Sequence, residues 1–378
     1  MLGLYVHIPF CARRCPYCDF AVHIGAGASF VADYVAALQS ELMSVLAKNR
    51  APIATIFFGG GTPTALPPKV LAGLMSLIRD HADILPSAEI SIEANPENSG
   101  DELFGTLRAS GWNRLSLGAQ SFDDEVLKKA GRVHTRAQIE YSMEVARRAG
   151  FENISLDLMF ALPGQSRDSW RETLHRAIEL EPTHLSCYSL TIEPDTNFAV
   201  RVARGEMIPL EENAQAELMS DAFEISHKAD IERYEVSNYA RREMECAHNL
   251  NYWRGGDYLS AGCGAHGHKS GHRWWNERDA KNYVSRIRND GNARVGEEHL
   301  TAMQRFNELL MLGLRLREGF DVKKALDKLE IENRVLDGAF CDATRDLRGL
   351  GLLEEGEVLR LKSHAFALAD GIAARLML

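Results

Sequence analysis

The chain has 378 residues, of which 45% are hydrophobic and 25% charged, and its formal charge is −10 with histidine neutral. This balance is typical of a globular protein and excludes a disordered chain, a collagen-like repeat and a coiled coil. The acidic charge argues against an extended nucleic-acid surface, so we expect no nucleic-acid partner. No run of about 18 apolar residues occurs, and the first residues do not resemble a secretory signal. We therefore expect no transmembrane segment and a reducing, cytoplasmic location.

Short β-rich segments alternate with amphipathic helical segments over the first half of the chain. The expected strands are Leu4–Ile8, Thr55–Phe58, Glu89–Glu93, Arg114–Leu117, Ile154–Met159 and His184–Leu190. The expected helices are Phe30–Ala47, Lys69–Asp80, Gly100–Ala109, Gln138–Ala149 and Arg167–Leu180. Six strands alternating with helices predict parallel pairing, in an α/β barrel or a doubly wound sheet. In either fold, ligands collect at the carboxyl ends of the strands.

The pattern changes after about residue 210. Glu211–Ala229 is predicted to be one more helix, and residues 233–275 are rich in Tyr, Trp, His, Gly and Asn with little periodicity. From Thr301 onward, short helices lead to a tight turn and an acidic hairpin, an arrangement that predicts a small winged-helix-like packing unit. We expect three parts: a barrel over 1–230, a His- and aromatic-rich segment over 231–298, and a winged-helix-like domain over 299–378.

Seven cysteines are present, and three of them, Cys11, Cys15 and Cys18, fall within eight residues directly after the first expected strand. Three thiolates at this spacing can hold an iron–sulfur cluster in which one iron lacks a protein ligand. The alternatives are a zinc site completed by His7 or His23, and three unrelated reduced thiols. Three aromatic residues are expected to shield a cluster from solvent, namely Phe10, Tyr17 and Phe20. Cys187 and Cys341 are interpreted as small buried hydrophobic residues.

Polar residues follow several of the later strands. The turn Gly59-Gly60-Gly61-Thr62-Pro63 comes after the second strand, where glycines allow close approach of a ligand and offer N–H donors. Glu93 would be costly inside an apolar strand unless a ligand amino or hydroxyl group, or a salt bridge, satisfied it. Gln120, Arg132 and Asp157 occur near the ends of later strands, and each of them alone would be an ordinary polar residue at a barrel rim.

The segment Tyr5-Val6-His7-Ile8-Pro9-Phe10-Cys11, followed by Cys15-Pro16-Tyr17-Cys18, resembles the motif of radical S-adenosylmethionine (SAM) proteins related to oxygen-independent coproporphyrinogen III oxidase. The resemblance implies an α/β fold, a partial (β/α)6 barrel, whose [4Fe–4S] cluster is held by Cys11, Cys15 and Cys18. SAM would bind the open iron through its amino and carboxylate groups. The residues that the resemblance places at or beside SAM are Tyr5, Tyr17, Gly60, Gly61, Thr62, Glu93, Gln120, Arg132 and Asp157.

Two features depart from the oxidases. They carry a further cysteine two positions after the third, where this chain has Phe20. The segment His248-Asn249-Leu250-Asn251-Tyr252-Trp253 resembles the H-N-x-x-Y-W motif of the HemW haem chaperones, in which it is associated with haem binding. The resemblance implies His248 as a haem ligand, oriented by Asn249 and flanked by aromatic surface, although a lone histidine among aromatics is more often hydrogen-bonded in a core. Competing ligands in this region are Cys246, Cys263, His266 and His268, and four arginines are candidates to pair with haem propionates: Arg241, Arg242, Arg254 and Arg273.

The leading hypothesis is a haem chaperone that binds haem and hands it to an acceptor protein, while retaining the cluster and SAM. The alternative is an enzyme of the coproporphyrinogen III oxidase type, which uses radical chemistry to decarboxylate propionate side chains. A zinc-stabilised interaction module is a third hypothesis. The expected partners are haem or a porphyrin and a haem-acceptor protein that the sequence does not identify. A peripheral membrane contact and a homodimer are left open.

Overall fold

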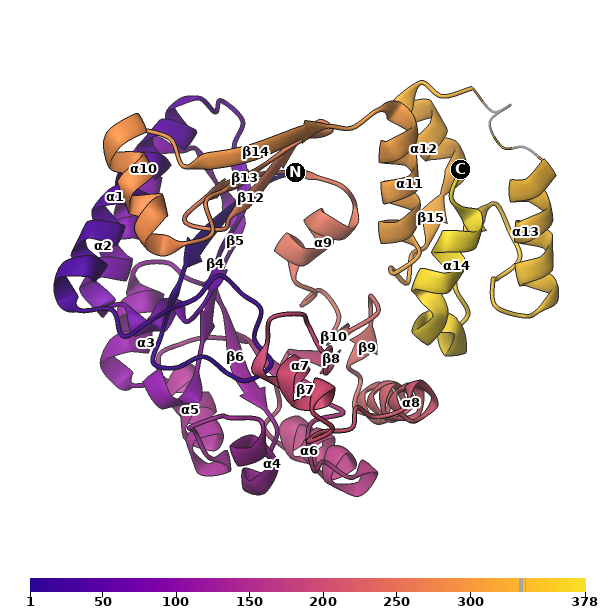
Figure 1. Cartoon of the computed structure of the whole chain (residues 1–378), viewed down its shortest axis with the longest axis horizontal. Helices are drawn as coiled ribbons and strands as arrows, with labels where there is room; N and C mark the ends of the chain where they lie inside the picture. The colour runs from indigo at the N-terminus through magenta and orange to yellow at the C-terminus, as the bar shows by residue number, and fades with distance from the viewer. Residues whose placement is uncertain (333–335, 337) are drawn as a thin grey trace.

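A computed structural model describes residues 1–332, 336 and 338–378 of the chain (Figure 1). A 12-stranded sheet forms its main body, and six parallel strands at the centre follow the order β1-β4-β5-β6-β7-β8. These strands are Leu2–Ile8, Ile53–Gly60, Ile84–Ala94, Arg114–Gln120, Asn153–Phe160 and His184–Ser189. The predicted parallel α/β class is confirmed. Among the described residues β1 and β8 are not neighbours, so the six strands form a partial barrel.

Helices cover the outer face of the parallel strands (Figure 1). In chain order, α1 to α6 are Ala28–Ala47, Pro68–His81, Asp101–Ala109, Asp124–Lys129, Arg136–Arg148 and Arg167–Glu179. α8 (Glu212–Lys228) follows β8 and packs beside α6. The expected helical repeat is buried on the inner face of α5, where Ile139, Met143 and Ala146 meet the sheet. The apolar residues spaced three and four apart in the helix predicted over Gln138–Ala149 are thus the ones that pack against the sheet.

Helix α1 is, by length and composition, the one described helix apolar enough to cross a membrane. Its inner face, however, carries the buried carboxylate of Glu41, which accepts hydrogen bonds from Asn276 Nδ2 at 2.7 Å and Tyr283 Oη at 2.6 Å. The backbone N–H of Gly262 donates to the same carboxylate at 2.8 Å. A buried carboxylate with fixed protein partners is a feature of a protein interior, so we interpret α1 as a core helix of the barrel.

The His- and aromatic-rich segment, for which the sequence predicted little regular structure, extends the sheet at both ends. β11 (Asp257–Ala261) pairs in parallel with β1, and the antiparallel strands β12, β13 and β14 continue this edge. These three strands are His266–Lys269, His272–Asn276 and Arg294–His299. At the other end β10 (Asn238–Ala240) and β9 (Glu232–Arg233) pair antiparallel beyond β8. The sheet thus runs across the boundary expected at residue 230, and the three-part division stays a prediction.

Further short elements complete this part of the chain. They are β2 (Phe10–Cys11), β3 (His23–Ile24), α7 (Asn197–Ala203), α9 (Ala247–Trp253) and α10 (Ala280–Asp290). β2 and β3 pair in parallel on either side of the cysteine loop, and this pairing fixes where the loop leaves and returns. Figure 1 places α9 between the barrel and the helices at the C-terminal end.

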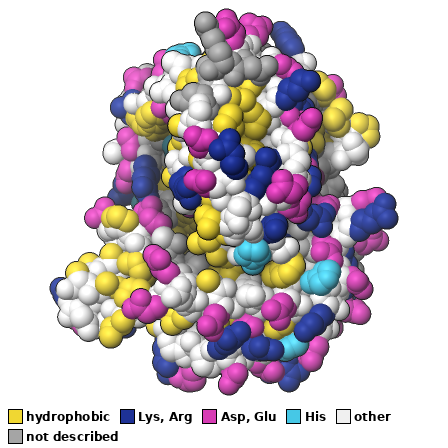
Figure 2. All heavy atoms as spheres, turned by 90° about the vertical axis from the view of Figure 1, so that its right-hand side faces the viewer, with side chains coloured by type: hydrophobic (Ala, Val, Ile, Leu, Met, Phe, Trp, Pro, Cys, Tyr) yellow, Lys and Arg dark blue, Asp and Glu magenta, His cyan; other side chains and the backbone are white. Residues whose placement is uncertain are grey.

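The C-terminal residues build a second hydrophobic core around Phe306, Leu310 and Phe366. Its elements are α11 (Ala302–Gly313), β15 (Phe320–Asp321), α12 (Val322–Leu329), α13 (Gly338–Gly349), β16 (Val358–Leu359) and α14 (Ala369–Leu376). The expected turn is present, closed by an antiparallel bridge between Leu353 and Leu361. Figure 2 faces this part of the molecule and shows acidic and basic side chains interspersed over it, without a broad basic area.

Candidate functional site

A cavity of about 1050 Å³ lies at the carboxyl ends of the parallel strands, and its lining includes the predicted cluster ligands, the residues predicted beside SAM and the implied haem ligand. These are Tyr5, Cys11, Cys15, Tyr17, Cys18, Gly60, Gly61, Thr62, Glu93, Gln120, Arg132, Asp157 and His248. The volume slightly exceeds the roughly 300–1,000 Å³ that single small-molecule sites occupy. Residues up to 243 positions apart in the chain therefore share one space.

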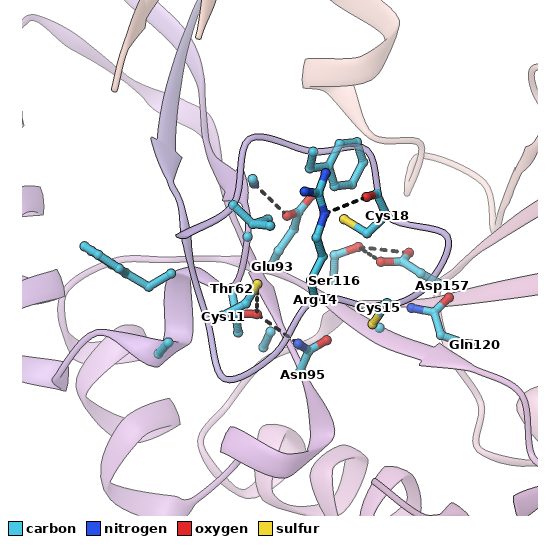
Figure 3. Close-up of a pocket in the computed structure, with 18 of the residues that line it drawn as sticks. Cys11, Arg14, Cys15, Cys18, Thr62, Glu93, Asn95, Ser116, Gln120 and Asp157 are labelled. Atoms are coloured by element: carbon cyan, nitrogen blue, oxygen red, sulfur yellow. Dashed lines mark hydrogen bonds between the residues drawn. The ribbon is translucent and has the colours of Figure 1, made fainter. Parts of the chain in front are cut away.

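Cys11 ends β2, Cys15 and Cys18 lie on the loop that follows it, and each of the three is half-buried. In Figure 3 their sulfur atoms lie along the inner side of this loop, around the side chain of Arg14. A backbone hydrogen bond of 3.1 Å from Cys18 N–H to the Cys15 carbonyl forms the turn between the last two. Burial raises the pKa of the Cys11 and Cys18 thiols. Three thiols suit an iron–sulfur cluster in which each of three irons takes one thiolate and the fourth iron lacks a protein ligand.

Of the two histidines proposed to complete a zinc site, His7 is already hydrogen-bonded within the protein. His7 is buried, its Nε2 donates to the carbonyl of Ala21 at 2.8 Å, and its Nδ1 accepts from the Tyr5 hydroxyl at 3.0 Å. Both ring nitrogens are therefore in use, and burial lowers the pKa of His7 to about 4. His23 packs its ring against Phe30 instead.

The glycine-rich turn after β4 packs tightly against the strand that precedes the cysteines. A Cβ on Gly60, whose φ is +115°, would lie 2.4 Å from Cε1 of His7, and one on Gly61 would lie 2.7 Å from the carbonyl carbon of Pro9. The N–H groups of this turn donate within the protein, that of Gly60 to Glu93 Oε2 at 3.1 Å and that of Gly61 to the Ile8 carbonyl at 2.8 Å. The expectation that these N–H groups face a ligand is thus wrong, and the glycines supply space.

Gly60→Ala is expected to lower the free energy of unfolding by about 2–4 kcal/mol, because the new methyl group meets a buried ring at a positive φ. Urea unfolding followed by circular dichroism measures this loss. Gly73→Ala is the matched control: Gly73 is exposed on α2 with nothing within 4 Å of its Cβ position. In a helix that change gains up to about 1 kcal/mol. Equal stabilities of the two variants would contradict the proposed crowding at Gly60.

Two carboxylates line the interior of the cavity. Asp157, on β7, accepts hydrogen bonds from the hydroxyls of Ser116 at 2.9 Å, Ser155 at 3.1 Å and Ser186 at 2.8 Å. Glu93, at the end of β5, accepts only the Gly60 N–H among the described residues, which leaves oxygen lone pairs free for a ligand. Burial, and then the charge of Asp157, raises the pKa of Glu93 to about 8. A cationic ligand beside Glu93 would lower this pKa again and favour the charged carboxylate.

A chain of hydrogen bonds connects two of the cysteines through polar side chains. Arg132 Nη1 donates to Cys15 Sγ at 3.5 Å, and its Nη2 donates to Asn95 Oδ1 at 2.6 Å. Asn95 Nδ2 in turn donates to Thr62 Oγ1 at 2.9 Å, and this hydroxyl lies 3.5 Å from Cys11 Sγ. The arginine brings positive charge beside the thiols, and the chain orients the cysteine loop against the strand ends.

Gln120 and the aromatic residues complete the lining. Gln120 ends β6 with a φ of +63°, in the left-handed region that non-glycine residues rarely adopt, and strain of this kind gathers at ligand sites. Tyr5 stacks on Phe57 with ring centroids 6.4 Å apart, and Tyr17 packs on Phe198. Phe20 also lines the cavity, at its rim, and is 67% exposed.

Comparison with known proteins agrees with this arrangement. Residues 5–177 match the Radical SAM superfamily. A Bacillus subtilis protein named heme chaperone HemW is 38% identical over 96% of both chains, and an Escherichia coli protein of that name is 40% identical over 70% of each. The chain belongs to the HemW family. The E. coli coproporphyrinogen III oxidase HemN, described as a radical SAM enzyme, matches in fold with a TM-score of 0.87 over 100% of this chain and 90% of its own, at 23% identity.

His248, which the resemblance implied as a haem ligand, lies at the start of α9, where its ring is buried against β1 and β4. Its Nδ1 is hydrogen-bonded to Thr55 Oγ1 and its Nε2 to Tyr252 Oη, both at 2.8 Å. The ring stacks on Phe57, and Gly3 leaves it room, since a Cβ there would come within 3.1 Å of Cε1. Burial lowers the pKa of His248 to about 3, so the ring is neutral. The hydroxyl groups of Thr55 and Tyr252 therefore orient the imidazole, a role that the sequence predicted for Asn249.

Glu89 on β5 fixes the first turn of α9. Its carboxylate accepts the N–H groups of Ala247 at 2.9 Å and His248 at 3.1 Å, and the Cys246 thiol lies 3.5 Å away. A carboxylate at a helix N-terminus satisfies N–H groups that lack helical partners and complements the helix dipole. Cys246 is therefore a buried packing residue at the helix start.

Most of the other candidates for the haem region have protein partners. Both ring nitrogens of His268 are hydrogen-bonded to the backbone, the Cys263 thiol lies 3.6 Å from Tyr34 Oη, and His266 stacks on Trp275. Arg254 pairs with Glu318, and Arg273 pairs with Glu298 and Glu308. The interpretation of Cys341 as buried is wrong, because it is exposed on α13, whereas Cys187 is buried in β8.

The sequence missed several residues that shape the site. Asn95 joins Thr62 to Arg132, and Ser116, Ser155 and Ser186 hold Asp157. The available signal was position: each serine lies between two apolar residues of a predicted strand, where a buried hydroxyl needs a partner. Asn95 follows directly after β5 and precedes a proline, at the strand end where ligands collect.

Proposed function

We propose that this chain binds haem and transfers it to an acceptor protein in the cytoplasm, and that it retains a [4Fe–4S] cluster and SAM. One observation carries the proposal: His248, Asn249 and Tyr252 line the same cavity as the three cysteines and Glu93. The similarity to proteins named haem chaperones over nearly the whole chain supports it. Neither a peripheral membrane contact nor a homodimer is required.

In this proposal Cys11, Cys15 and Cys18 hold the cluster, and the hydrogen-bond chain through Arg132 and Asn95 orients their loop. When bound, the cluster and SAM supply electron-transfer and radical chemistry. The chain itself positions SAM: Glu93 gives up its proton and pairs with the positive charge of SAM, and Asp157 accepts hydrogen bonds. Tyr5 and the turn at Gly60 and Gly61 shape the adjoining wall.

Haem binds at the His248 side of the cavity. Phe57 and Tyr252 offer flat apolar surface beside the imidazole, and a neutral imidazole is a suitable axial ligand. Because Tyr252 Oη occupies Nε2, coordination through this nitrogen requires the tyrosine hydroxyl to move away first. Haem uptake would therefore replace the hydrogen bond between His248 Nε2 and Tyr252 Oη with a bond from Nε2 to the haem iron.

His248→Ala is expected to weaken haem binding by about tenfold or more and to change the haem absorption spectrum, because an axial ligand is lost. Tyr252→Phe frees Nε2 and is expected to speed haem uptake. Cluster-reconstituted protein is titrated anaerobically with haem, with His266→Ala as the control from the same region. Unchanged affinity and spectrum in His248→Ala would remove this residue from the haem site.

The second candidate function is oxidative decarboxylation of coproporphyrinogen III. The HemN-like fold and the complete set of residues expected around SAM favour it. The absence of a cysteine at position 20 distinguishes this chain from the oxidases that it resembles. An anaerobic assay on the preparation used for the haem titration decides: stoichiometric formation of protoporphyrinogen would replace the chaperone proposal.

A further inference from the structure

A second group of metal-ligating side chains lies outside the cavity, on the ribbon formed by β13 and β14. His272, Glu297 and His299 each bring one ligand atom within 4.8 Å of the other two. His272 Nε2 and Glu297 Oε2 are 3.0 Å apart, and the two imidazole rings stack with centroids 4.1 Å apart and planes 5° from parallel. Two histidines and a carboxylate are thus held together at one point.

The pairing of the two strands places these side chains on one face. His272 lies opposite His299 in the antiparallel register, and Glu297 lies opposite Trp274. Residues two apart in a strand point to the same side, so all three ligands project together. β14 is the terminal strand of the sheet, Glu297 and His299 are exposed, and the side chain of His272 is 28% exposed. An ion from solvent reaches them without any change in the core.

We propose that His272, Glu297 and His299 form a binding site for a divalent transition-metal ion such as Zn²⁺. Two imidazoles and one carboxylate are the protein ligands of known zinc sites in which water completes the coordination. The ion takes the place of the hydrogen bond between His272 and Glu297. Arg294 now contacts Glu297 Oε2 at 3.3 Å, and its guanidinium also lies over the ring of Trp274. When the ion binds Glu297, Arg294 gives up the contact with Glu297 and keeps the one with Trp274. The site is independent of the proposed haem function.

A bound ion would cross-link β13 to β14 two residues before Thr301, the residue that caps α11. The ribbon is the last part of the sheet before the C-terminal helices begin (Figure 1). Ligand binding to the folded state alone stabilises that state in proportion to the logarithm of the free metal concentration. We therefore expect Zn²⁺ to raise the thermal midpoint of the protein.

The test is a calorimetric titration of Zn²⁺ into anaerobically cluster-reconstituted protein, repeated with Co²⁺ and visible absorption. One ion per chain is expected, with a cobalt spectrum that lacks thiolate charge-transfer bands. His272→Ala and His299→Ala are each expected to weaken binding by about tenfold or more, and Glu297→Gln to weaken it less. His227→Ala is the matched control, because His227 forms an exposed pair with Glu232 at 2.7 Å.

Three results would overturn the proposal: no saturable Zn²⁺ binding, equal affinities in the wild type and both histidine variants, or an equal loss in His227→Ala. Thermal midpoints without metal show that each variant folds, and two independent histidine variants guard against failure of one. Haem titration of the same variants separates this site from the proposed function, since haem affinity is expected to stay unchanged when Zn²⁺ binding is lost.

Discussion

Cys15→Ala is expected to abolish assembly of the iron–sulfur cluster. Two thiolates remain, and the guanidinium of Arg132 loses the sulfur that it contacts at 3.5 Å. A four-iron cluster held by three thiolates does not tolerate the loss of one, because the remaining contacts leave two irons open. Iron and sulfide analysis after anaerobic reconstitution, together with visible absorption, measures the loss. SAM affinity is expected to fall with it.

Cys341→Ala is the matched control for this experiment, since Cys341 is an exposed cysteine on α13. It is expected to keep the full iron and sulfide content of the wild type. Zinc in place of iron in the anaerobically isolated wild-type protein would support the interaction-module hypothesis instead. A full cluster in Cys15→Ala would remove this residue from the ligand set.

Glu93→Gln is expected to reduce SAM affinity by about tenfold or more, because the carboxyl group can lose its proton when a cationic ligand binds and then pair with it, whereas the amide stays neutral. The same substitution changes how stability depends on pH. Burial and Asp157 raise the pKa of Glu93 from 4.5 in an unperturbed chain to about 8, so the folded state holds a proton that the unfolded state has lost. Stability without ligand therefore falls as pH rises from about 5 to 8.

Glu93→Gln lacks this titration, and its free energy of unfolding is expected to improve relative to the wild type by roughly 2–4 kcal/mol over that pH interval. Urea unfolding at several pH values measures the difference. Glu235→Gln is the matched control: Glu235 is buried, burial raises the pKa of its carboxyl to about 7, and it lies outside the cavity lining. It is expected to alter the pH dependence while leaving SAM affinity unchanged. Equal SAM affinities in the wild type and Glu93→Gln would exclude Glu93 from the site.

The first half of the fold could be predicted because local patterns agree with its tertiary structure. Each parallel strand contains buried apolar residues, and the covering helices show an apolar repeat that the barrel buries. The later strands β11 to β14 escaped prediction. They hold mostly aromatic, histidine and charged residues, such as His272 and Trp274, and pairing with β1 and with one another stabilises them as strands.

The candidate site was predictable residue by residue but not in its internal contacts. Glu93 and Asp157 were expected near a ligand, yet the serines that hold Asp157 come from three different strands. The hydrogen bonds of the Gly60 turn and the exposure of Phe20 depend on how the loop after β2 packs. Such contacts join residues far apart in the chain, and no local pattern encodes them.

By itself, the sequence determined the parallel α/β class, the cysteine triad and the set of polar residues at the strand ends, because spacing and periodicity are local properties. Only the tertiary structure decided that His248 shares the cavity of Cys11 and Glu93, with both ring nitrogens hydrogen-bonded to hydroxyls. It alone placed His272 opposite His299. The physical reason is that strand register and helix docking bring together residues whose separation in the chain carries no information about their contact.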